Sequence, residues 1–366
     1  MGVCSGIVAV IAIIVGLLLS PLPTNLGFYR WVATRNPENP MLVGFCPAMN
    51  YDVPWGYTFE QLYQHDLTGQ NALVTGANSG LGYEVSLALA KLGASVVMAC
   101  RNEARCLKAA QDIRQQEDVK GQVFPMKVEL SSLQSVKSFA EAYRLIVGPL
   151  GMLFLNAGIG SQTPMGADQF LLSEDGIELV FATNVVGHHL LYKLLEPNLG
   201  ESKMARVVLT SSSASFDTYN YSVATDLETL NGEEVTAQTI NKVYGQSKLA
   251  QIMWAKKLTR SLGPDANIFV NAAHPGAVAT PIFSKGPIPQ FLQKVFAWMQ
   301  PLMWSADVAA LNLLYLGVAT DELVKENIRG KYHHPIAVEV VNPLSLDEKL
   351  QDDLWRFLDD LVADFA

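Results

Sequence analysis

The sequence predicts an α/β fold in which a doubly wound parallel sheet carries helices on both faces. Short runs of almost wholly apolar residues alternate along the chain with longer segments of helical periodicity. Such alternation is typical of parallel strands that are buried on both sides and joined by crossover helices. A glycine-rich turn, residues 75–82, follows the first apolar run and opens the first helical segment. Because crossovers are right-handed, we expect a ligand crevice at the carboxyl ends of the strands.

The elements follow in a regular order within a single expected domain, residues 69–366. The expected strands are residues 71–74, 95–100, 123–128, 152–155, 206–210 and 268–273. The expected helices are residues 84–92, 104–116, 132–145, 175–195 and 244–262.

The N-terminal segment, residues 1–20, is expected to form a membrane-anchor helix. The 18 residues from Val3 to Ser20 carry no charge, and about 20 apolar residues span a bilayer. Arg30 and Arg35 follow this segment, so the positive-inside rule places the rest of the chain in the cytosol. A cleaved signal peptide and a buried helix are the alternatives, although the positive start and the cleavage site of a signal peptide are missing. Residues 21–68 are expected to be a spacer that lies on the domain or on the membrane surface.

Composition excludes several classes of protein. The 366 residues carry a net charge of −9, with 49% hydrophobic and 17% charged residues, which suits a folded domain. Nothing supplies a basic face, so we expect no nucleic-acid partner. The cysteines show no C-x-x-C pairs, so we expect no disulfide framework, no zinc site and a reducing compartment. The four are Cys4, Cys46, Cys100 and Cys106.

The turn over residues 75–82 predicts a nucleotide site of the Rossmann type. Its glycines are spaced Gly-x3-Gly-x-Gly, which permits a tight turn and a close approach of the backbone to a pyrophosphate. The free N–H groups at the start of the following helix then face the phosphate charge. The residues expected to hold the cofactor here are Gly76, Asn78, Ser79, Gly80, Leu81 and Gly82.

The ends of the next strands extend this site. Arg101 and Asn102 follow the second strand, where an acidic residue binds a ribose 2′-hydroxyl and an arginine accommodates a 2′-phosphate. Arg101 therefore favours NADP over NAD, and a solvated arginine in a βα loop is the alternative. Other residues at strand ends are expected beside the adenine and the ribose, namely Glu129, Leu130, Asn156, Ala157 and Gly158.

A candidate catalytic group lies further along the chain. Tyr244 and Lys248 are four residues apart and therefore share one face of a helix. A lysine cation near a phenol favours the phenolate and brings the tyrosine pKa toward acid–base use at neutral pH. Ser212, or alternatively Ser211, ends a strand at the same rim and can bind the substrate oxygen. Asn184 is expected to be a surface amide or to hold a buried water beside Lys248.

Together with Pro275 and Gly276, these motifs resemble the short-chain dehydrogenase/reductase family from about Gly69 to the C-terminus. The resemblance implies a catalytic tetrad: Asn184 supports a water, Ser212 orients the substrate, Tyr244 is the acid/base, and Lys248 binds the ribose and lowers the Tyr244 pKa. It also implies that the cofactor is contacted by Tyr244, Lys248, Pro275, Gly276, Val278 and Thr280.

Within that family, the sequence is similar to the retinol dehydrogenase-like branch on residues 99–102, 183–188, 244–250 and 274–276. This similarity implies NADP(H) as cofactor and a hydrophobic substrate, namely a retinoid, a steroid or a lipid aldehyde or ketone. It also implies a single-pass protein of the endoplasmic reticulum or of lipid droplets, with the catalytic domain in the cytosol. A sterol or 3-ketoacyl-lipid reductase and a non-catalytic nucleotide-binding scaffold are the alternatives, and a homo-oligomer is compatible with all of them.

Residues 281–304 are the expected substrate lid. The aromatic and methionine side chains of this segment suit an apolar pocket, a contact with the membrane surface, or the protein core. Residues 213–242 are a second expected rim of the pocket. The side chains concerned in the first segment are Phe283, Phe291, Phe296, Trp298, Met299, Met303 and Trp304.

Overall fold

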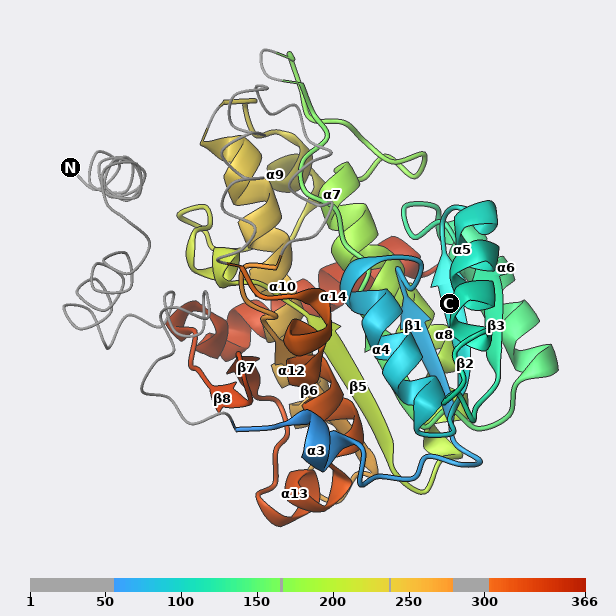
Figure 1. The fold of residues 1–366 in the computed structure, drawn as a ribbon. Coiled ribbons are helices and arrows are strands. Elements are labelled where there is room, and N and C mark those ends of the chain that lie inside the picture. The colour runs from blue at the N-terminus through green and yellow to red at the C-terminus, as the bar shows by residue number, and fades with distance from the viewer. Residues whose placement is uncertain (1–55, 165–166, 237, 279–302) are drawn as a thin grey trace, which may run out of the picture.

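The computed structural model describes residues 56–164, 167–236, 238–278 and 303–366. Its sheet runs in the order β3-β2-β1-β4-β5-β6-β7-β8 (Figure 1). Neighbouring strands are parallel from β3 to β7, and β8 is antiparallel to β7. The direction of winding reverses between β1 and β4, which is the switch point of a doubly wound sheet. The strands are β1 (Asn71–Thr75), β2 (Ser95–Cys100), β3 (Val123–Lys127), β4 (Met152–Leu155), β5 (Ala205–Thr210), β6 (Ile268–Ala273), β7 (Tyr332–His334) and β8 (Val338–Glu339).

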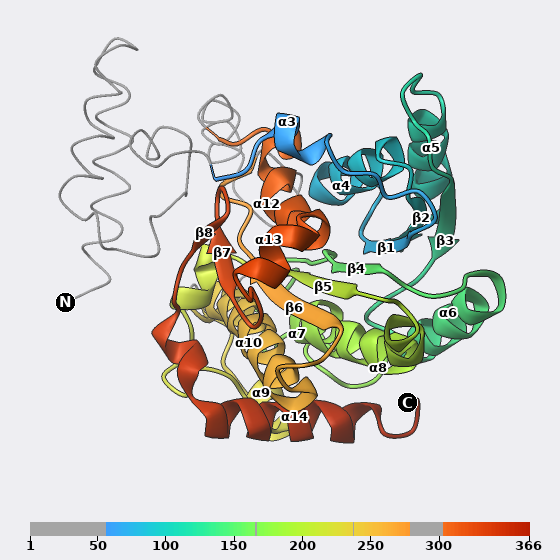
Figure 2. The same cartoon turned by 90° about the horizontal axis from the view of Figure 1, so that it is seen from below.

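Helices cover both faces of the sheet, as Figure 2 shows from the edge. One face is packed by α3 (Phe59–Leu62), α4 (Gly80–Lys91), α5 (Glu103–Arg114) and α12 (Ala306–Val318). The opposite face is packed by α6 (Leu133–Ile146), α8 (Gly187–Gly200), α10 (Thr239–Leu262) and α14 (Glu348–Val362). The predicted doubly wound α/β fold is confirmed. Shorter helices are α7 (Leu179–Phe181), α9 (Leu227–Asn231) and α13 (Thr320–Lys325).

The helix expected over residues 175–195 is divided in the structure. The Glu178 side chain accepts hydrogen bonds from the N–H groups of Val180 and Phe181 and thereby starts α7. A π-helical turn, Ala182–Val186, then leads into α8. Such turns widen a helix locally and are frequent at functional sites.

Residues 56–68, which belong to the expected spacer, pack on the domain. Thr58 and Gln61 form a capping box: each side chain accepts a hydrogen bond from the other residue's backbone N–H. Tyr57 is buried, and its ring centre lies 5.3 Å from that of Tyr315 in α12. The folded unit therefore includes residues that precede the glycine-rich turn by almost 20 positions.

Several sequence-based predictions fall outside the described residues. These are the anchor, residues 1–20, the spacer up to residue 55, Thr280, and most of the expected lid. Among the helices of the described ranges, none is both long enough and apolar enough to cross a membrane. From the lid, Trp304 is described: it is 2% exposed, and its backbone N–H donates to the Ala277 carbonyl at 2.8 Å. Trp304 therefore belongs to the core.

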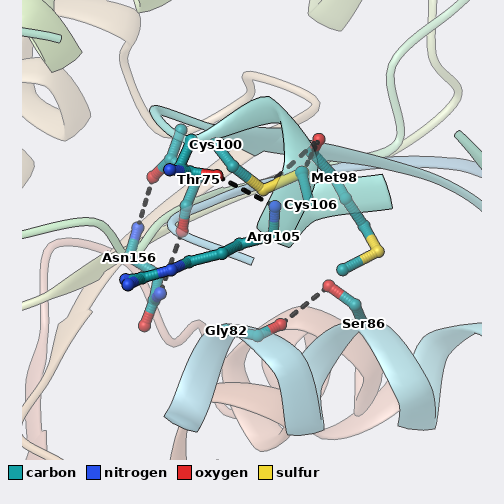
Figure 3. The surroundings of a disulfide bond; sticks show 9 residues. Thr75, Gly82, Ser86, Met98, Cys100, Arg105, Cys106 and Asn156 are labelled. Atoms are coloured by element: carbon teal, nitrogen blue, oxygen red, sulfur yellow. Dashed lines mark hydrogen bonds between the residues drawn. A yellow bond between two sulfur atoms is a disulfide. The ribbon is translucent and has the colours of Figure 1, made fainter. Parts of the chain in front are cut away.

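The sequence predicts no disulfide framework, but the structure holds one disulfide. Cys100, the last residue of β2, and Cys106 in α5 are joined by a disulfide, with Cα atoms 5.9 Å apart (Figure 3). No C-x-x-C spacing is needed, because α5 turns back along β2 and carries a side chain six positions later into the same buried layer. The inference of a reducing compartment rested on unpaired cysteines and loses its basis.

Candidate active site

The glycine-rich turn between β1 and α4 forms one wall of an open groove of about 1320 Å³ at the carboxyl ends of the strands. Gly76 and Gly80 have φ angles of +67° and +56°, which glycine adopts without steric cost. A Cβ atom on Gly82 would lie 2.5 Å from the Gly76 carbonyl oxygen, so this position admits no side chain. The residues of the turn that line the groove are Gly76, Asn78, Ser79, Gly80, Leu81 and Gly82.

The start of α4 is chemically suited to a phosphate. Ser79 is its N-cap residue, yet the Ser79 side chain makes no capping hydrogen bond. The first N–H groups of the helix therefore remain available to a ligand, and such groups bind anions. With the close backbone approach that Gly76 and Gly82 permit, the turn fits the pyrophosphate of a dinucleotide.

Arg101 and Glu129 lie in the wall of the same groove. The Arg101 side chain is 72% exposed, and its Nε lies 3.7 Å from the Glu129 carboxylate. Leu130 also lines the groove, whereas Asn102 caps α5 by accepting a hydrogen bond from the Arg105 N–H at 2.9 Å. The Arg101 guanidinium thus lies where the sequence predicts contact with a 2′-phosphate, and the Glu129 carboxylate lies beside it.

The segment after β4 is held against β1. The Thr75 hydroxyl oxygen accepts the N–H groups of Asn156 and Ala157, both at 2.9 Å. The Asn156 side-chain amide donates to the Thr75 carbonyl at 2.9 Å (Figure 3). A Cβ atom on Gly158 would lie 3.2 Å from Lys248 Nζ, so the backbone here runs directly beside the lysine. These contacts build the floor of the groove.

An adjoining hollow of about 540 Å³, termed the catalytic hollow, is lined by three of the four side chains expected to be catalytic, and Asn184 is not among its lining residues. Tyr244 and Lys248 reach it from α10, and Ser212 follows β5. Ser212 lies close enough to Tyr244 to lower its pKa, and the Ser212 hydroxyl oxygen accepts the Ala214 N–H at 3.1 Å. Ser211 instead donates its hydroxyl to the Lys248 carbonyl at 2.7 Å. Of the two serines, Ser212 is thus the one that contacts Tyr244.

Burial changes the acid–base properties of both α10 side chains. It raises the pKa of Tyr244 to about 12, and the interaction with Ser212 opposes this rise. It lowers the pKa of Lys248 to about 7. Lys248 Nζ lies 5.4 Å from the centre of the Tyr244 ring. Near neutral pH the lysine of the free protein is therefore only partly charged, and a ligand that favours its ammonium form is needed before it can lower the Tyr244 pKa.

Asn184 is fully buried in the π-helical turn, so the alternative of a surface amide is wrong. Its Oδ1 accepts the Ile159 N–H at 2.8 Å, and its Nδ2 donates to the Ile159 carbonyl and to the Ser247 hydroxyl, both at 3.0 Å. Its backbone carbonyl accepts from His188 Nδ1 at 3.0 Å and from Gln251 Nε2 at 2.9 Å.

Pro275, Gly276 and Val278 follow β6 and line the catalytic hollow. His274, which precedes them, lines it too. Its side chain is 3% exposed, and neither ring nitrogen has a hydrogen-bond partner within the described residues. A buried unpaired polar group costs stability, so a bound ligand that offers it a partner is favoured. This orphaned imidazole is a further feature that fits a nicotinamide cofactor.

Sequence reasoning missed three buried polar residues around the site: His188, Gln251 and His274. Each stands among apolar neighbours in its own segment, and this is the signal that singled out Asn184. The same signal was available for His188 and Gln251, which lie on helices. His274 could have been found from its position directly after an apolar strand and before Pro275, because residues at strand ends line the predicted crevice.

Comparisons with known proteins agree with this geometry. The family model described as short chain dehydrogenase matches residues 70–224. Retinol dehydrogenase 14 of Mus musculus is 32% identical over 307 residues, which cover 81% of this chain and 86% of that protein. Retinol dehydrogenase 13 of Mus musculus is 33% identical over 294 residues, which cover 79% and 82%. Among solved structures, an uncharacterised protein from Mycobacterium Paratuberculosis has a TM-score of 0.60 and 27% identity, covering 82% of this chain and 95% of that one.

Proposed function

Since the chain belongs to the short-chain dehydrogenase family and its relatives include retinol dehydrogenases, we propose that it is an NADP(H)-dependent oxidoreductase. It transfers a hydride between the nicotinamide and a hydrophobic carbonyl or alcohol, such as a retinoid, a steroid or a lipid aldehyde or ketone. The observation that carries this proposal is the contact between Tyr244 and Ser212 beside Lys248, in a hollow that adjoins the dinucleotide groove.

Residues of the dinucleotide groove and of the catalytic hollow would together hold the cofactor. The start of α4 would hold the pyrophosphate, and Arg101, Glu129 and Leu130 would hold the adenosine end. Gly158 and the segment after β6 would hold the nicotinamide end. The remaining cofactor contacts would come from Asn156, Ala157, Tyr244, Lys248, Pro275, Gly276 and Val278. Thr280, which lies outside the described residues, is proposed on the family resemblance alone.

The catalytic side chains act on the substrate oxygen and its proton. The bound cofactor supplies or accepts the hydride at the substrate carbon. The Ser212 hydroxyl donates a hydrogen bond to the substrate oxygen and orients it. The Tyr244 hydroxyl passes a proton to that oxygen during reduction and takes it back during oxidation. The Lys248 ammonium binds the ribose, and the negative phosphates of the cofactor favour its charged form, which in turn lowers the Tyr244 pKa.

The preference for NADP(H) is supported by the position of Arg101. Its guanidinium is exposed at the groove and follows β2, where a residue contacts the 2′-substituent of the adenosine ribose. A guanidinium matches a phosphate in charge and in hydrogen-bond geometry.

The substrate class is supported by the names of two relatives, retinol dehydrogenases 14 and 13. Residues 1–20 are proposed to attach the enzyme to a membrane of the endoplasmic reticulum or a lipid droplet, where such substrates dissolve. Charge flanking the segment favours a catalytic domain in the cytosol.

The test uses purified full-length chain with NADPH or NADP+ and a panel of retinal, steroids, fatty aldehydes, small ketones and the matching alcohols. Tyr244→Phe is expected to lower turnover by about 10²–10⁴-fold, because the proton donor is lost. NADPH binding, followed by fluorescence, is expected to persist in this variant. Unchanged turnover in Tyr244→Phe would refute the role of the tyrosine, and a wild type inactive on the whole panel would favour the nucleotide-binding scaffold.

A further inference from the structure

Gln251, which the proposed catalytic set does not include, connects Lys248 to the backbone of Asn184. Lys248 Nζ donates to Gln251 Oε1 at 3.1 Å, and Gln251 Nε2 donates to the Asn184 carbonyl at 2.9 Å. Gln251 is 1% exposed. A single side-chain amide therefore spans the distance between the ammonium and the carbonyl.

The chemistry of its neighbours determines how this amide is oriented. An ammonium only donates and a carbonyl only accepts, so the Gln251 oxygen must face Lys248 and its NH2 must face Asn184. His188 Nδ1 donates to the same carbonyl at 3.0 Å, while His188 Nε2 accepts from the Thr75 hydroxyl at 3.0 Å. The Asn184 carbonyl oxygen thus accepts hydrogen bonds from both His188 and Gln251, and Gln251 is the side chain that connects this carbonyl to Lys248.

The same contacts fix the direction of the ammonium. One of its three N–H bonds donates to the Thr210 carbonyl at 2.7 Å, and a second donates to Gln251. Gly158 lies on the remaining side, where a Cβ atom would be 3.2 Å from Nζ. Because Gly158 lines both the dinucleotide groove and the catalytic hollow, the third N–H is left for a ligand there.

We propose that Gln251 is a positioning residue, which joins Lys248 to the Asn184 carbonyl and so directs the ammonium toward the cofactor ribose. It takes the place that the family resemblance gives to a water supported by Asn184. This inference rests on the proposed function, because it concerns the ribose of a bound nicotinamide cofactor.

The surroundings of Lys248 make this contact important for its charge. The titratable groups that face it are Tyr244 on α10, His188 on α8 and His274 after β6. None of them is acidic, and no salt bridge in the described part of the chain includes Lys248. The Gln251 oxygen and the Thr210 carbonyl are therefore the groups that stabilise the ammonium against its burial.

The first experiment titrates Lys248 in the full-length protein without cofactor, by NMR of 13Cε-labelled lysine, with Lys248→Met identifying the signal. Gln251→Met keeps the volume but removes the acceptor, and it is expected to lower the midpoint of the Lys248 titration by about one pH unit. Gln251→Glu places a carboxylate beside the ammonium and is expected to raise the midpoint. This opposite sign is not what a purely structural role would produce.

The matched control is Gln246→Met. Gln246 lies on the same helix, is fully buried, and accepts the Ala224 N–H at 2.8 Å. It makes no hydrogen bond to Lys248, so its replacement is expected to leave the Lys248 midpoint unchanged. An unchanged midpoint in Gln251→Met, or equal shifts in the two methionine variants, would overturn the proposal.

A second experiment measures NADPH affinity against pH by fluorescence. Gln251→Met is expected to bind NADPH about tenfold more weakly and to lose binding at a lower pH than the wild type, because its ammonium is less stable and less well directed. Wild-type affinity and pH dependence in this variant would contradict the positioning role. If the wild-type chain itself neither binds nor oxidises NADPH, the proposed function fails, while the cofactor-free titration still decides whether Gln251 controls Lys248.

Discussion

At the level of single residues, the proposed preference for NADP(H) can be tested at Arg101. Arg101→Asp replaces the expected partner of the 2′-phosphate with a like charge. We expect the affinity for NADPH relative to NADH to fall by about 10- to 100-fold, which is the effect of losing a charge-assisted hydrogen bond and adding repulsion. The ratio is measured by fluorescence titration with both cofactors.

Lys108→Asp provides the control for this change. Lys108 is exposed on α5 and undergoes the same reversal of charge away from the groove. The cofactor preference of the Lys108→Asp variant is expected to match that of the wild type. If Arg101→Asp also keeps the wild-type preference, Arg101 does not bind the phosphate.

Site residues could be predicted where a sequence pattern corresponds to a single backbone geometry. The glycine turn is such a case, because the observed positive φ angles and the lack of space at Gly82 leave glycine as the residue that fits. Gln251 could not be found this way. Its partner Asn184 lies 67 positions earlier on another helix, and only the folded arrangement brings them together.

At the level of elements, the Cys100–Cys106 disulfide joins the end of β2 to α5 and closes the loop that carries Arg101. Breaking it is expected to lower the free energy of unfolding by about 2 kcal/mol, since the unfolded chain regains the entropy of a short loop. Urea unfolding of Cys106→Ser against the oxidised wild type measures this difference.

The doubly substituted chain Cys100→Ser/Cys106→Ser is the control for reductant. Dithiothreitol is expected to destabilise the wild type and to leave this variant unchanged. Free thiols at both positions in the purified protein, detected by mass spectrometry after alkylation, would show that the pair is not formed.

Strand prediction succeeded where the sheet is covered on both faces. Residues 95–100, 152–155 and 268–273 were predicted with the observed bounds, because uninterrupted apolar runs are what two covering helix layers require. β7 could not be predicted: it reads Tyr-His-His and is three residues long. The helix over residues 175–195 was divided because Glu178 caps it from within, which hydrophobic periodicity does not reveal.

At the level of the whole molecule, the proposed membrane attachment depends on residues 1–20. Deleting them is expected to move the protein from the membrane pellet to the supernatant after cell fractionation, because the uncharged segment is removed. The folded domain is expected to keep its cofactor binding, since it begins after this segment. A truncated chain that stays in the pellet after a high-salt wash would contradict attachment through this segment.

The Cys100–Cys106 disulfide makes it necessary to test which side of the membrane the domain occupies. Disulfides persist in oxidising compartments and are rare in the cytosol. Protease protection of sealed microsomes distinguishes the two sides: a cytosolic domain is digested without detergent, and a lumenal domain is protected. Protection would overturn the orientation that the positive-inside rule predicts.

The close packing at Gly56 has a consequence for how such an enzyme would meet a bilayer. A Cβ atom on Gly56 would lie 2.7 Å from the Ile336 carbonyl oxygen, so the chain joins the domain at the turn that follows β7. β7 is parallel to β6, and both strands end on the side of the sheet where His274 lines the catalytic hollow. The described part of the domain thus begins at this rim and not at the opposite end. A membrane anchor attached at this point would hold the opening of the catalytic hollow close to the bilayer. A hydrophobic alcohol would then cross only a short distance through water before it reacts.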